Sequence, residues 1–352
     1  MRKYKICRIP GDDIGPEVME ACMLVLDELD LNIDWIDAEA GWACWEKYGT
    51  TVPDHTWERL REAECCLFSA ITSKPGIPGF KSAIVWIRQA FDLYANVRPI
   101  KAYPGCPLNY RDDIDFVVVR ENTEGLYKGI EFHPTPKELL ELSGLKDYNP
   151  DDMAISLRVF TREGCERIVR FAFDLAKKQG RKSVVAAHKA NIIRKTCGMF
   201  LESAQRVAKD YPDIEFWDIN IDALAMRLVK HPQIFDVIVT TNMFGDIIAD
   251  EAGQLVGGLG LAPSANIGEE YALFEPIHGS APKYKGMYKV NPMAQILSAK
   301  LMLEWLGEEE MAGRVEAAVA AVIKEGRTVT YDLGGEAGTL AVARAVAERL
   351  RE

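Results

Sequence analysis

The sequence lacks several features that would each indicate a class of function. No apolar run approaches the roughly 18 residues that a membrane-spanning helix needs. No block of lysines and arginines occurs, and the formal net charge of −11 argues against nucleic acid or an anionic membrane surface as partner. The first residues contain no apolar signal region, so we expect a cytoplasmic protein.

Cysteine is present but forms no recognisable pattern. The eight cysteines include no C-x-x-C pair and no spacing typical of a metal site. Most of them stand in apolar or helical patterns, so we expect reduced thiols and not a disulfide framework. The dinucleotide fingerprint G-x-G-x-x-G is also missing, which argues against a standard Rossmann fold.

The residues that are present predict a soluble α/β protein. With 352 residues, 48% hydrophobic and 27% charged, the chain can form about two domains with a sizeable core. Residues 131–153 interrupt the α/β alternation with three prolines and a short acidic helix, and look like an inserted arm. We predict strands at 5–10, 33–38, 65–72, 115–120, 183–188, 214–219 and 237–241, helices near 53–63, 162–179, 189–209, 223–230 and 293–306, and a loop at 274–284.

The segment 236–272 places two acidic side chains one helical turn apart. An apolar run at 237–241 predicts a buried strand, which leads into a helix that carries Asp246 and Asp250. Carboxylates at i and i+4 lie one above the other, close enough for a divalent cation to bridge them. Two solvated acids near a helix start would be the simpler explanation. The position after a buried strand favours a metal site.

Three arginines and a lysine stand near the ends of apolar segments. Arg88 lies on an amphipathic helix, Arg98 on the next extended segment, and Arg120 at the end of a strand. Each alone could be a surface residue. Because guanidinium groups bind carboxylates in a bidentate manner, the three together predict a site for a polycarboxylate. Lys189 at a strand end is a candidate base if burial lowers its pKa, or else a surface lysine. Asp222, at a helix start, is by default a capping residue.

Motifs along the whole chain resemble one known family. They are IPGDDIGPEV, IRQAFDLYANVRP, VVRENTEGLY, HKANI, FGDIIADEAGQLVGGLGLAPSANIG and FEPIHGSAP, in this order. The chain is similar to the β-decarboxylating dehydrogenases of isocitrate, homoisocitrate and 3-isopropylmalate. The resemblance implies that family's own α/β fold, with two domains and a clasp arm. It implies a large domain of residues 1–99 and 252–352, a small domain of 100–251, and an arm at about 129–160.

The resemblance also implies a reaction and the residues that perform it. The family oxidises a 2-hydroxy-3-carboxy acid with NAD or NADP and releases the 3-carboxylate as CO2. Lys189 and Asp222 of the partner subunit would complete each site of a homodimer or of a tetramer of two dimers. Lys189 would assist removal of the hydroxyl proton, and Tyr127 would protonate the enol carbon. The implied residues are Ser82, Arg88, Arg98 and Arg120 for the substrate, Tyr127, Lys189 and Asp222 for catalysis, and Asp222, Asp246 and Asp250 for Mg²⁺ or Mn²⁺.

Cofactor choice depends on the loop after HGSAP. NAD-using relatives begin this segment with aspartate, whereas this chain has Lys283 and Tyr284, and a lysine would attract the 2′-phosphate of NADP. NADP-using isocitrate dehydrogenases resemble the chain here and at Tyr331, but add an arginine where this chain has Gly335. We therefore predict NADP, with NAD as the alternative. The implied cofactor residues are Thr72, Asn191, His278, Gly279, Ser280, Ala281, Lys283, Tyr284, Asn291 and Tyr331.

The distal group of the substrate depends on the helix before Arg88. Ser82 matches a serine of isocitrate enzymes, but Ile84 stands where they have an asparagine. Ile84 and Val85 resemble homoisocitrate enzymes, and could also face the isopropyl group of 3-isopropylmalate. Lys81 and Ser82 would lack a partner beside a wholly apolar group, so we expect isocitrate or homoisocitrate, with 3-isopropylmalate as the alternative.

Some residues depart from the family pattern. Asp13 and Ser69 replace two glycines near the expected nicotinamide pocket. A catalytically silent regulatory subunit is the alternative from a different functional class. Such subunits typically lose the tyrosine, the lysine or the metal-binding aspartates, and this chain retains all of them.

Overall fold

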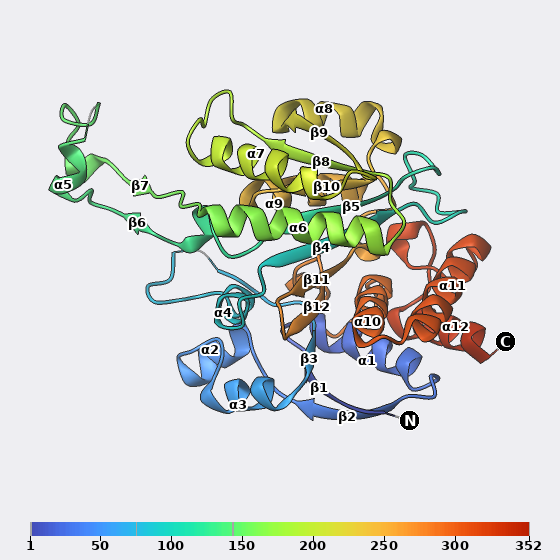
Figure 1. Cartoon of the computed structure of the whole chain (residues 1–352). Helices are drawn as coiled ribbons and strands as arrows, with labels where there is room; N and C mark the ends of the chain where they lie inside the picture. The colour runs from blue at the N-terminus through green and yellow to red at the C-terminus, as the bar shows by residue number, and fades with distance from the viewer. Residues whose placement is uncertain (1, 75, 143, 352) are drawn as a thin grey trace.

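A mixed β-sheet runs through both lobes of the molecule (Figure 1). The computed structural model describes residues 2–74, 76–142 and 144–351, and within them this sheet has ten strands. In sheet order the strands are β2 (Asn32–Asp37), β1 (Lys3–Ile9), β3 (Cys65–Phe68), β12 (Ala272–Pro276), β11 (Pro263–Ile267), β4 (Ala95–Lys101), β5 (Asp115–Glu121), β10 (Val237–Thr240), β8 (Ser183–His188) and β9 (Glu215–Asn220).

The strand direction reverses in the middle of the sheet. Strands β2, β1, β3 and β12 are mutually parallel, and so are β5, β10, β8 and β9. Strand β11 is antiparallel to β12 and β4, and β4 is antiparallel to β5, so the two parallel halves run in opposite directions. The predicted α/β fold is confirmed, and this strand order differs from that of a standard Rossmann sheet.

Helices cover both faces of the sheet, because most strands are buried on both sides. In β5, Val117 and Val119 belong to one hydrophobic cluster and Phe116 and Val118 to another, as the two-residue period of a strand requires. The first face carries α1 (Gly15–Leu26), α6 (Arg162–Lys178), α7 (Thr196–Val207), α10 (Met293–Leu306), α11 (Glu309–Glu325) and α12 (Thr339–Arg351). The second carries α3 (Asp54–Glu62) and α4 (Ala83–Ala90) in one lobe, with α2 (Trp42–Tyr48) nearby, and α8 (Ile221–Lys230) and α9 (Asn242–Gln254) in the other.

Several predicted elements are present and two are wrong. The strand at 183–188 and the helix at 293–306 have the predicted bounds. The segment 274–276, predicted as a loop, is the buried end of β12. The helix predicted from residue 189 begins only at Thr196, because residues 189–193 form a separate turn in which the Lys189 carbonyl accepts from Ile192 and Ile193. All eight cysteines are free and buried.

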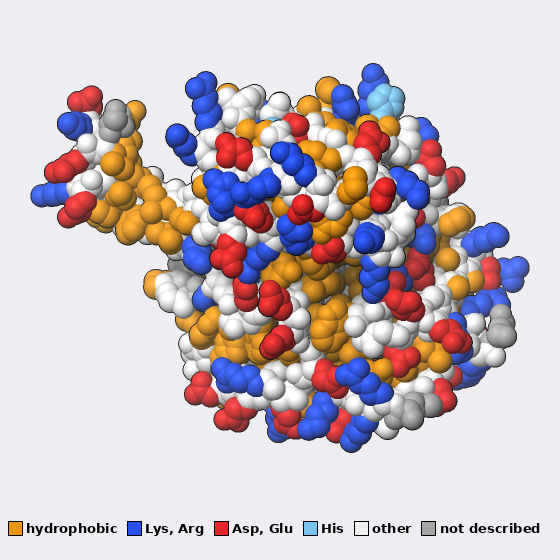
Figure 2. Space-filling view, in the orientation of Figure 1, with side chains coloured by type: hydrophobic (Ala, Val, Ile, Leu, Met, Phe, Trp, Pro, Cys, Tyr) orange, Lys and Arg blue, Asp and Glu red, His pale blue; other side chains and the backbone are white. Residues whose placement is uncertain are grey.

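An arm projects from the lobe that contains α6 to α9 (Figure 1). It consists of β6 (Glu131–Phe132), the short helix α5 (Lys137–Leu140) and β7 (Ile155–Ser156), with residue 143 of the predicted arm outside the described residues. Hydrophobic side chains run along its visible surface (Figure 2), and Leu142 and Tyr148 are 56% and 60% exposed. The predicted interruption of the α/β alternation is therefore present.

The predicted division into two domains stays a prediction. Its two boundaries, after residues 99 and 251, fall inside β4 and α9, and the sheet continues across them. Both chain ends lie in the lobe of α1, α11 and α12 (Figure 1). No helix of the described residues is long and apolar enough to cross a membrane.

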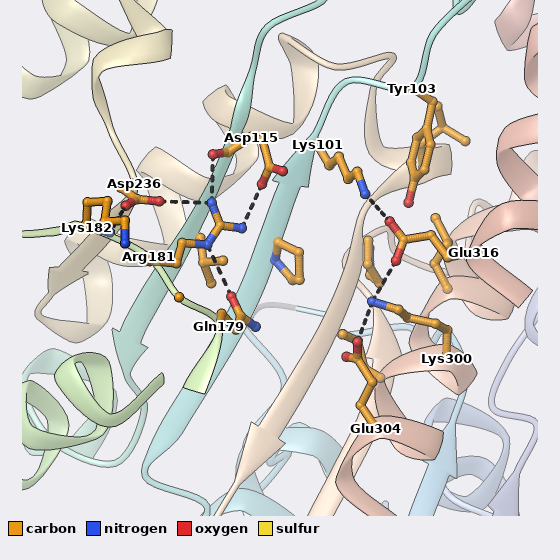
Figure 3. Close-up of a pocket in the computed structure, with 17 residues that line it drawn as sticks. Lys101, Tyr103, Asp115, Gln179, Arg181, Lys182, Asp236, Lys300, Glu304 and Glu316 are labelled. Carbon is orange, nitrogen blue, oxygen red and sulfur yellow. Dashed lines mark hydrogen bonds and ion pairs between the residues drawn. The ribbon is translucent and has the colours of Figure 1, made fainter. Parts of the chain in front are cut away.

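A cavity of about 560 Å³ lies on the sheet face opposite α9 (Figure 3). On one wall Arg181 pairs with Asp115 at 2.6 Å and with Asp236 at 3.1 Å. On the other wall Lys300 of α10 pairs with Glu316 of α11 at 2.9 Å. These ion pairs balance the charges of each wall separately.

Candidate active site

The predicted acidic pair lies on α9 and contacts two of the predicted arginines. Arg98 donates from Nη2 to Asp246 Oδ1 at 3.0 Å and from Nη1 to Asp250 Oδ1 at 3.1 Å. Arg120 also donates to Asp246 Oδ1, and the hydroxyl of Tyr127 donates to Asp246 Oδ2 at 2.5 Å. Three predicted site residues, Arg98, Arg120 and Tyr127, therefore converge on the carboxylate of Asp246.

The register between β4 and β5 explains why the two arginines meet. Arg98 pairs with Val118, so Arg120, two residues further on, points to the same face of the sheet. At Gly245 of α9 a Cβ would lie 2.7 Å from the Cβ of Arg120, so glycine permits the close approach of helix and strand. Asn242 Oδ1 accepts from Arg120 Nε at 3.1 Å and Nη2 at 2.7 Å, which fixes the guanidinium against the first turn of α9.

Burial and neighbouring charges shift the pKa values in this cluster. Burial, reinforced by Arg98, lowers the pKa of Arg120 to about 10. Burial alone would raise the pKa of Asp246, but Arg120 and Arg98 outweigh it and hold that pKa below its usual range. At Asp250 burial prevails, reinforced by the charge of Asp246, and the pKa is raised. Burial and the hydrogen bond to Asp246 raise the pKa of Tyr127, so its hydroxyl stays protonated at neutral pH.

Arg88, the third predicted arginine, has a buried carboxylate partner. Its Nη2 donates to Glu275 Oε1 at 2.6 Å, and Asn266 Nδ2 donates to the same oxygen at 2.8 Å. Arg88 and Arg98 both line a cavity of about 180 Å³. The remaining lining residues are Ala70, Ile71, Ser73, Ile84, Ser264, Glu275, Pro276, Ile277, His278 and Gly279. Two of the three predicted arginines therefore line one cavity, whose other lining residues are both polar and apolar.

The two polar residues at the start of α4 have partners within the chain. The ammonium of Lys81 lies 5.4 Å from the ring centre of Trp86, and Ser73 Oγ donates to Ser82 Oγ at 2.9 Å. Both residues therefore have contacts within the chain, and the charged distal group of the substrate stays a prediction. Ile84 of the same helix lines the cavity of Arg88.

A second cavity, of about 380 Å³, gathers most of the predicted cofactor residues. It is lined by His278, Gly279, Ala281, Tyr284, Asn291 and Tyr331, and also by Ile14, Gly260, Val290 and Asp332, which were not predicted. Among the described residues, the buried atoms His278 Nε2 and Asp332 Oδ1 have no hydrogen-bond partner. Polar atoms without a partner in a cavity that is otherwise largely apolar are suited to binding a nucleotide. Because His278 and Gly279 line both cavities, the two are adjacent.

The other predicted cofactor residues lie around this cavity or apart from it. Thr72 Oγ1 and Ser280 Oγ are 2.5 Å apart, and Lys283 lies 4.6 Å from the ring centre of Tyr284. Asn191 is exposed, two residues after Lys189, and the structure does not bring it to the cavity.

The departures Asp13 and Ser69 both form local hydrogen bonds. Asp13 has φ +49°, a left-handed conformation that aspartate tolerates better than most residues, and its Oδ2 accepts from Thr72 Oγ1 at 2.9 Å. Ser69 Oγ donates to the Gly15 carbonyl at 3.1 Å. Both side chains therefore help to hold the first turn of the chain in place.

Lys189 and Asp222 form an ion pair apart from Asp246. Lys189 Nζ lies 2.5 Å from Asp222 Oδ1, and this hydrogen bond, together with backbone N–H groups at the start of α8, lowers the pKa of Asp222. The Asp222 side chain is 66% exposed. Within the described residues of one chain, no group of three or more His, Cys, Asp or Glu side chains could hold a metal ion.

Comparison with known proteins decides the family. A family model described as isocitrate/isopropylmalate dehydrogenase matches residues 5–349. The chain belongs to this family. The 3-isopropylmalate dehydrogenase of Methanothermobacter thermautotrophicus is 46% identical over 352 residues, covering 100% of both chains. The isocitrate/homoisocitrate dehydrogenase of Thermus thermophilus is 47% identical over 349 residues, covering 99% of each. The crystal structure of isocitrate dehydrogenase from Methylococcus capsulatus has a TM-score of 0.92 at 45% identity, covering 99% of this chain and 100% of that one.

These findings confirm the resemblance and the fold. The protein is a dehydrogenase of a family whose members depend on NAD(P) and a divalent metal ion and act on small polycarboxylates. Relatives with different named substrates are about equally similar to it, at 46% and 47% identity. Overall similarity therefore does not distinguish the substrate. The substrate of this dehydrogenase has to be inferred from individual residues.

Around the three arginines of this dehydrogenase, sequence reasoning missed three polar residues. Asn242 stands four residues before Asp246 on one face of α9, a spacing that could have revealed it. Glu275 and Asn266, around Arg88, lie on β12 and β11. Neither strand was predicted, because polar residues interrupt their apolar pattern.

Proposed function

We propose that this dehydrogenase catalyses the NADP-dependent oxidative decarboxylation of a 2-hydroxy-3-carboxy acid. The observation that carries the proposal is the convergence of Arg98, Arg120 and Tyr127 on Asp246. Guanidinium groups bind the carboxylates of a small acid in a bidentate manner. The phenol beside them is a protonated acid within the same site.

The residues of this chain account for the proton transfers of such a reaction. Lys189 of the partner subunit would accept the proton of the 2-hydroxyl group while hydride passes from C2 to the nicotinamide. The bond between C3 and its carboxylate then breaks, CO2 leaves, and the electron pair forms the enolate of the 2-oxo acid. Tyr127 would return a proton to C3.

A divalent cation fits the carboxylates near Arg98. Asp246 and Asp250 offer oxygen donors one helical turn apart, and such donors are preferred by Mg²⁺ and Mn²⁺. We expect Asp222 of the partner subunit as the third carboxylate. When bound, the cation would polarise the C2 oxygen as a Lewis acid. With Asp246 and Asp250 as ligands of the cation, the guanidinium of Arg98 would be available to the substrate.

A second copy of the chain is the partner that the surface favours. On α8, Met226 and Val229 are 63% and 54% exposed, and on α9, Ile247 is 59% exposed. Asp222, Met226 and Val229 share one face of α8, because they are spaced by one and two helical turns. Burying this apolar surface against a second copy would carry Asp222 toward the partner's active site. We therefore propose a homodimer with shared sites.

The distal group of the substrate is proposed to be apolar, as in 3-isopropylmalate. Ile71, Ile84 and Ile277 line the cavity of Arg88 and Arg98. A tricarboxylate such as isocitrate or homoisocitrate is the second candidate, because Ser73 lines the same cavity and bonds Ser82, next to Lys81.

Parallel turnover assays test this function. With Mg²⁺, we would follow reduced nicotinamide and CO2 from 3-isopropylmalate, isocitrate and homoisocitrate, each with NADP and with NAD. We expect Mg²⁺-dependent release of equimolar CO2 and reduced cofactor, fastest with 3-isopropylmalate and NADP. A higher kcat/KM for a tricarboxylate would overturn the apolar distal group alone. Failure of all three substrates would contradict the reaction and favour a silent subunit.

A further inference from the structure

Two lysines and two tyrosines form a compact cluster beside the cofactor cavity. The ammonium of Lys283 lies 4.6 Å from the ring centre of Tyr284, and that of Lys289 lies 5.0 Å from the ring centre of Tyr331. The two ring centres are 5.7 Å apart, and the ring planes are tilted by 45° to each other. The cluster therefore presents two ammonium groups and two phenol groups together.

The positive charge of this cluster is not neutralised. In the part of the chain that the structure describes, neither Lys283 nor Lys289 forms an ion pair, whereas Lys285 in the same loop pairs with Asp13 at 3.5 Å. The pKa of Tyr284 is lowered by its hydrogen bonds to Tyr331 and Lys283, and further by the charges of Lys283 and Lys289. The positive charges of both ammonium groups therefore act on the hydroxyl of Tyr284. The surroundings of this hydroxyl are suited to a multiply charged anion.

The backbone on each side of Lys289 is fixed. The N–H of Tyr288 donates to Glu17 Oε2 at 2.7 Å, and the N–H of Thr339 donates to the Tyr288 carbonyl at 2.7 Å. Thr339 Oγ1 donates to the carbonyl of Val290 at 2.6 Å, and Val290 is buried and lines the cavity. The exposed Lys289 side chain therefore starts from a rigid position next to the cavity.

The turn after Tyr331 cannot supply another cation. At Gly335 a Cβ would lie 2.1 Å from the carbonyl oxygen of Val329. The Gly335 N–H donates to the Thr330 carbonyl at 3.0 Å, and the Ala337 N–H donates to the Val329 carbonyl at 3.0 Å, so the turn is closed around this position. No side chain fits at residue 335 unless this backbone moves.

We propose that Lys289 binds the 2′-phosphate of an adenine nucleotide, together with Lys283, Tyr284 and Tyr331. Each ammonium and each hydroxyl group can donate a charge-assisted hydrogen bond to a phosphate oxygen. Lys289 then provides the second cation that Gly335 cannot. This inference rests on the proposed use of NADP.

Binding of two nucleotides that differ only in the 2′-phosphate tests the proposal without turnover. Titration calorimetry of the full chain with adenosine 2′,5′-bisphosphate and with 5′-AMP gives a ratio of the two affinities. We expect Lys289→Met to lower this ratio about 10-fold and to leave 5′-AMP binding unchanged, because one charge-assisted contact to the phosphate is lost. Lys289→Arg should retain most of the ratio. The matched control is Lys285→Met, which removes a lysine of the same loop that already has a carboxylate partner.

The outcomes separate this inference from the cofactor proposal. If the wild-type protein binds both nucleotides equally, the use of NADP and the role of Lys289 are both overturned. If the wild-type protein prefers the bisphosphate and Lys289→Met keeps that preference, the role of Lys289 is overturned and NADP stands. An equal loss of affinity for both nucleotides would assign Lys289 to loop structure, and would also contradict the proposal.

Discussion

Tyr127 is the side chain on which the last proton transfer of the proposed reaction depends. Its hydroxyl contacts Asp246, and burial together with this hydrogen bond keeps it protonated. Tyr127→Phe removes the proton donor and leaves the ring, so we expect kcat to fall about 100-fold or more with little change in KM. Steady-state kinetics of NADPH formation measure the effect. The control Tyr110→Phe alters a tyrosine that is 55% exposed and should have no effect. A loss below about threefold for Tyr127→Phe would remove it from the catalytic residues.

Single site residues were predictable where the residue type and its position in the local sequence were enough to indicate its role. Arg98, Arg120 and Asp246 were identified from their positions after apolar runs, and the structure brings them together. Lys289 was not identified, because its importance depends on which side chains lie across the loop from it. That information resides in the packing of distant segments.

At the scale of elements, two neighbouring apolar residues of α4, Ile84 and Val85, differ in whether they line the cavity of Arg88. Ile84 lines the cavity of Arg88 and Arg98, and among the described residues Val85 is not part of that lining. We expect Ile84→Asn to change the ratio of kcat/KM for 3-isopropylmalate and isocitrate at least about 10-fold in favour of isocitrate, because an amide replaces the apolar contact. Val85→Asn is the matched control and should change the ratio little. Equal effects of the two variants would contradict the assignment of Ile84 to the substrate cavity.

The contact between α10 and α11 is stabilised by a partly buried ion pair. Burial would raise the pKa of Glu316, but Lys300, with help from Lys101, outweighs it and holds this pKa below the ordinary value of 4.5. A carboxylate with a lowered folded-state pKa stabilises the fold above pH 4.5, and this contribution is lost as the pH falls through the folded-state pKa. We expect Glu316→Gln to lower the free energy of unfolding by about 2 kcal/mol near neutral pH.

Urea unfolding at two pH values checks the sign of this effect. The difference between wild type and Glu316→Gln should be largest near pH 7 and should shrink well below pH 4.5, where Glu316 is protonated in both states. Glu309→Gln removes a carboxylate that is 70% exposed and lies 3.7 Å from Lys178, so it should cost little. A difference that is independent of pH would show that Glu316 acts through packing and not through its charge.

Elements with a clear apolar period were predictable, and those in the middle of the sheet were not. The buried run of β10 and the helix α10 follow directly from the sequence. Strands β4 and β11 contain Asn96, Arg98 and Asn266, which interrupt the apolar pattern. Asn96 Nδ2 donates to Asn266 Oδ1 at 2.9 Å, so two buried amide groups pair inside the sheet. Burial of these amide groups is favourable only when the strands are paired, because the pairing brings the groups within hydrogen-bond distance.

At the scale of the whole molecule, we expect the proposed site to need two copies of the chain. Asp246 and Tyr127 lie together, whereas Lys189 pairs with an exposed Asp222 on a helix with an apolar outer face. The sequence alone suggested this division only through the family resemblance. The structure adds the physical reason, because Asp222 shares its helix face with exposed Met226.

Complementation between two inactive variants tests this central claim most directly. We would co-express Tyr127→Phe and Lys189→Met chains with different tags, purify the hybrids through both tags, and measure their activity beside each variant alone. If Tyr127 of one subunit works with Lys189 of the partner subunit, one of the two sites in a hybrid dimer retains both native residues. The account then predicts about half the wild-type activity per dimer. Hybrids as inactive as the parent variants would show that each site lies within one chain, and would contradict the account.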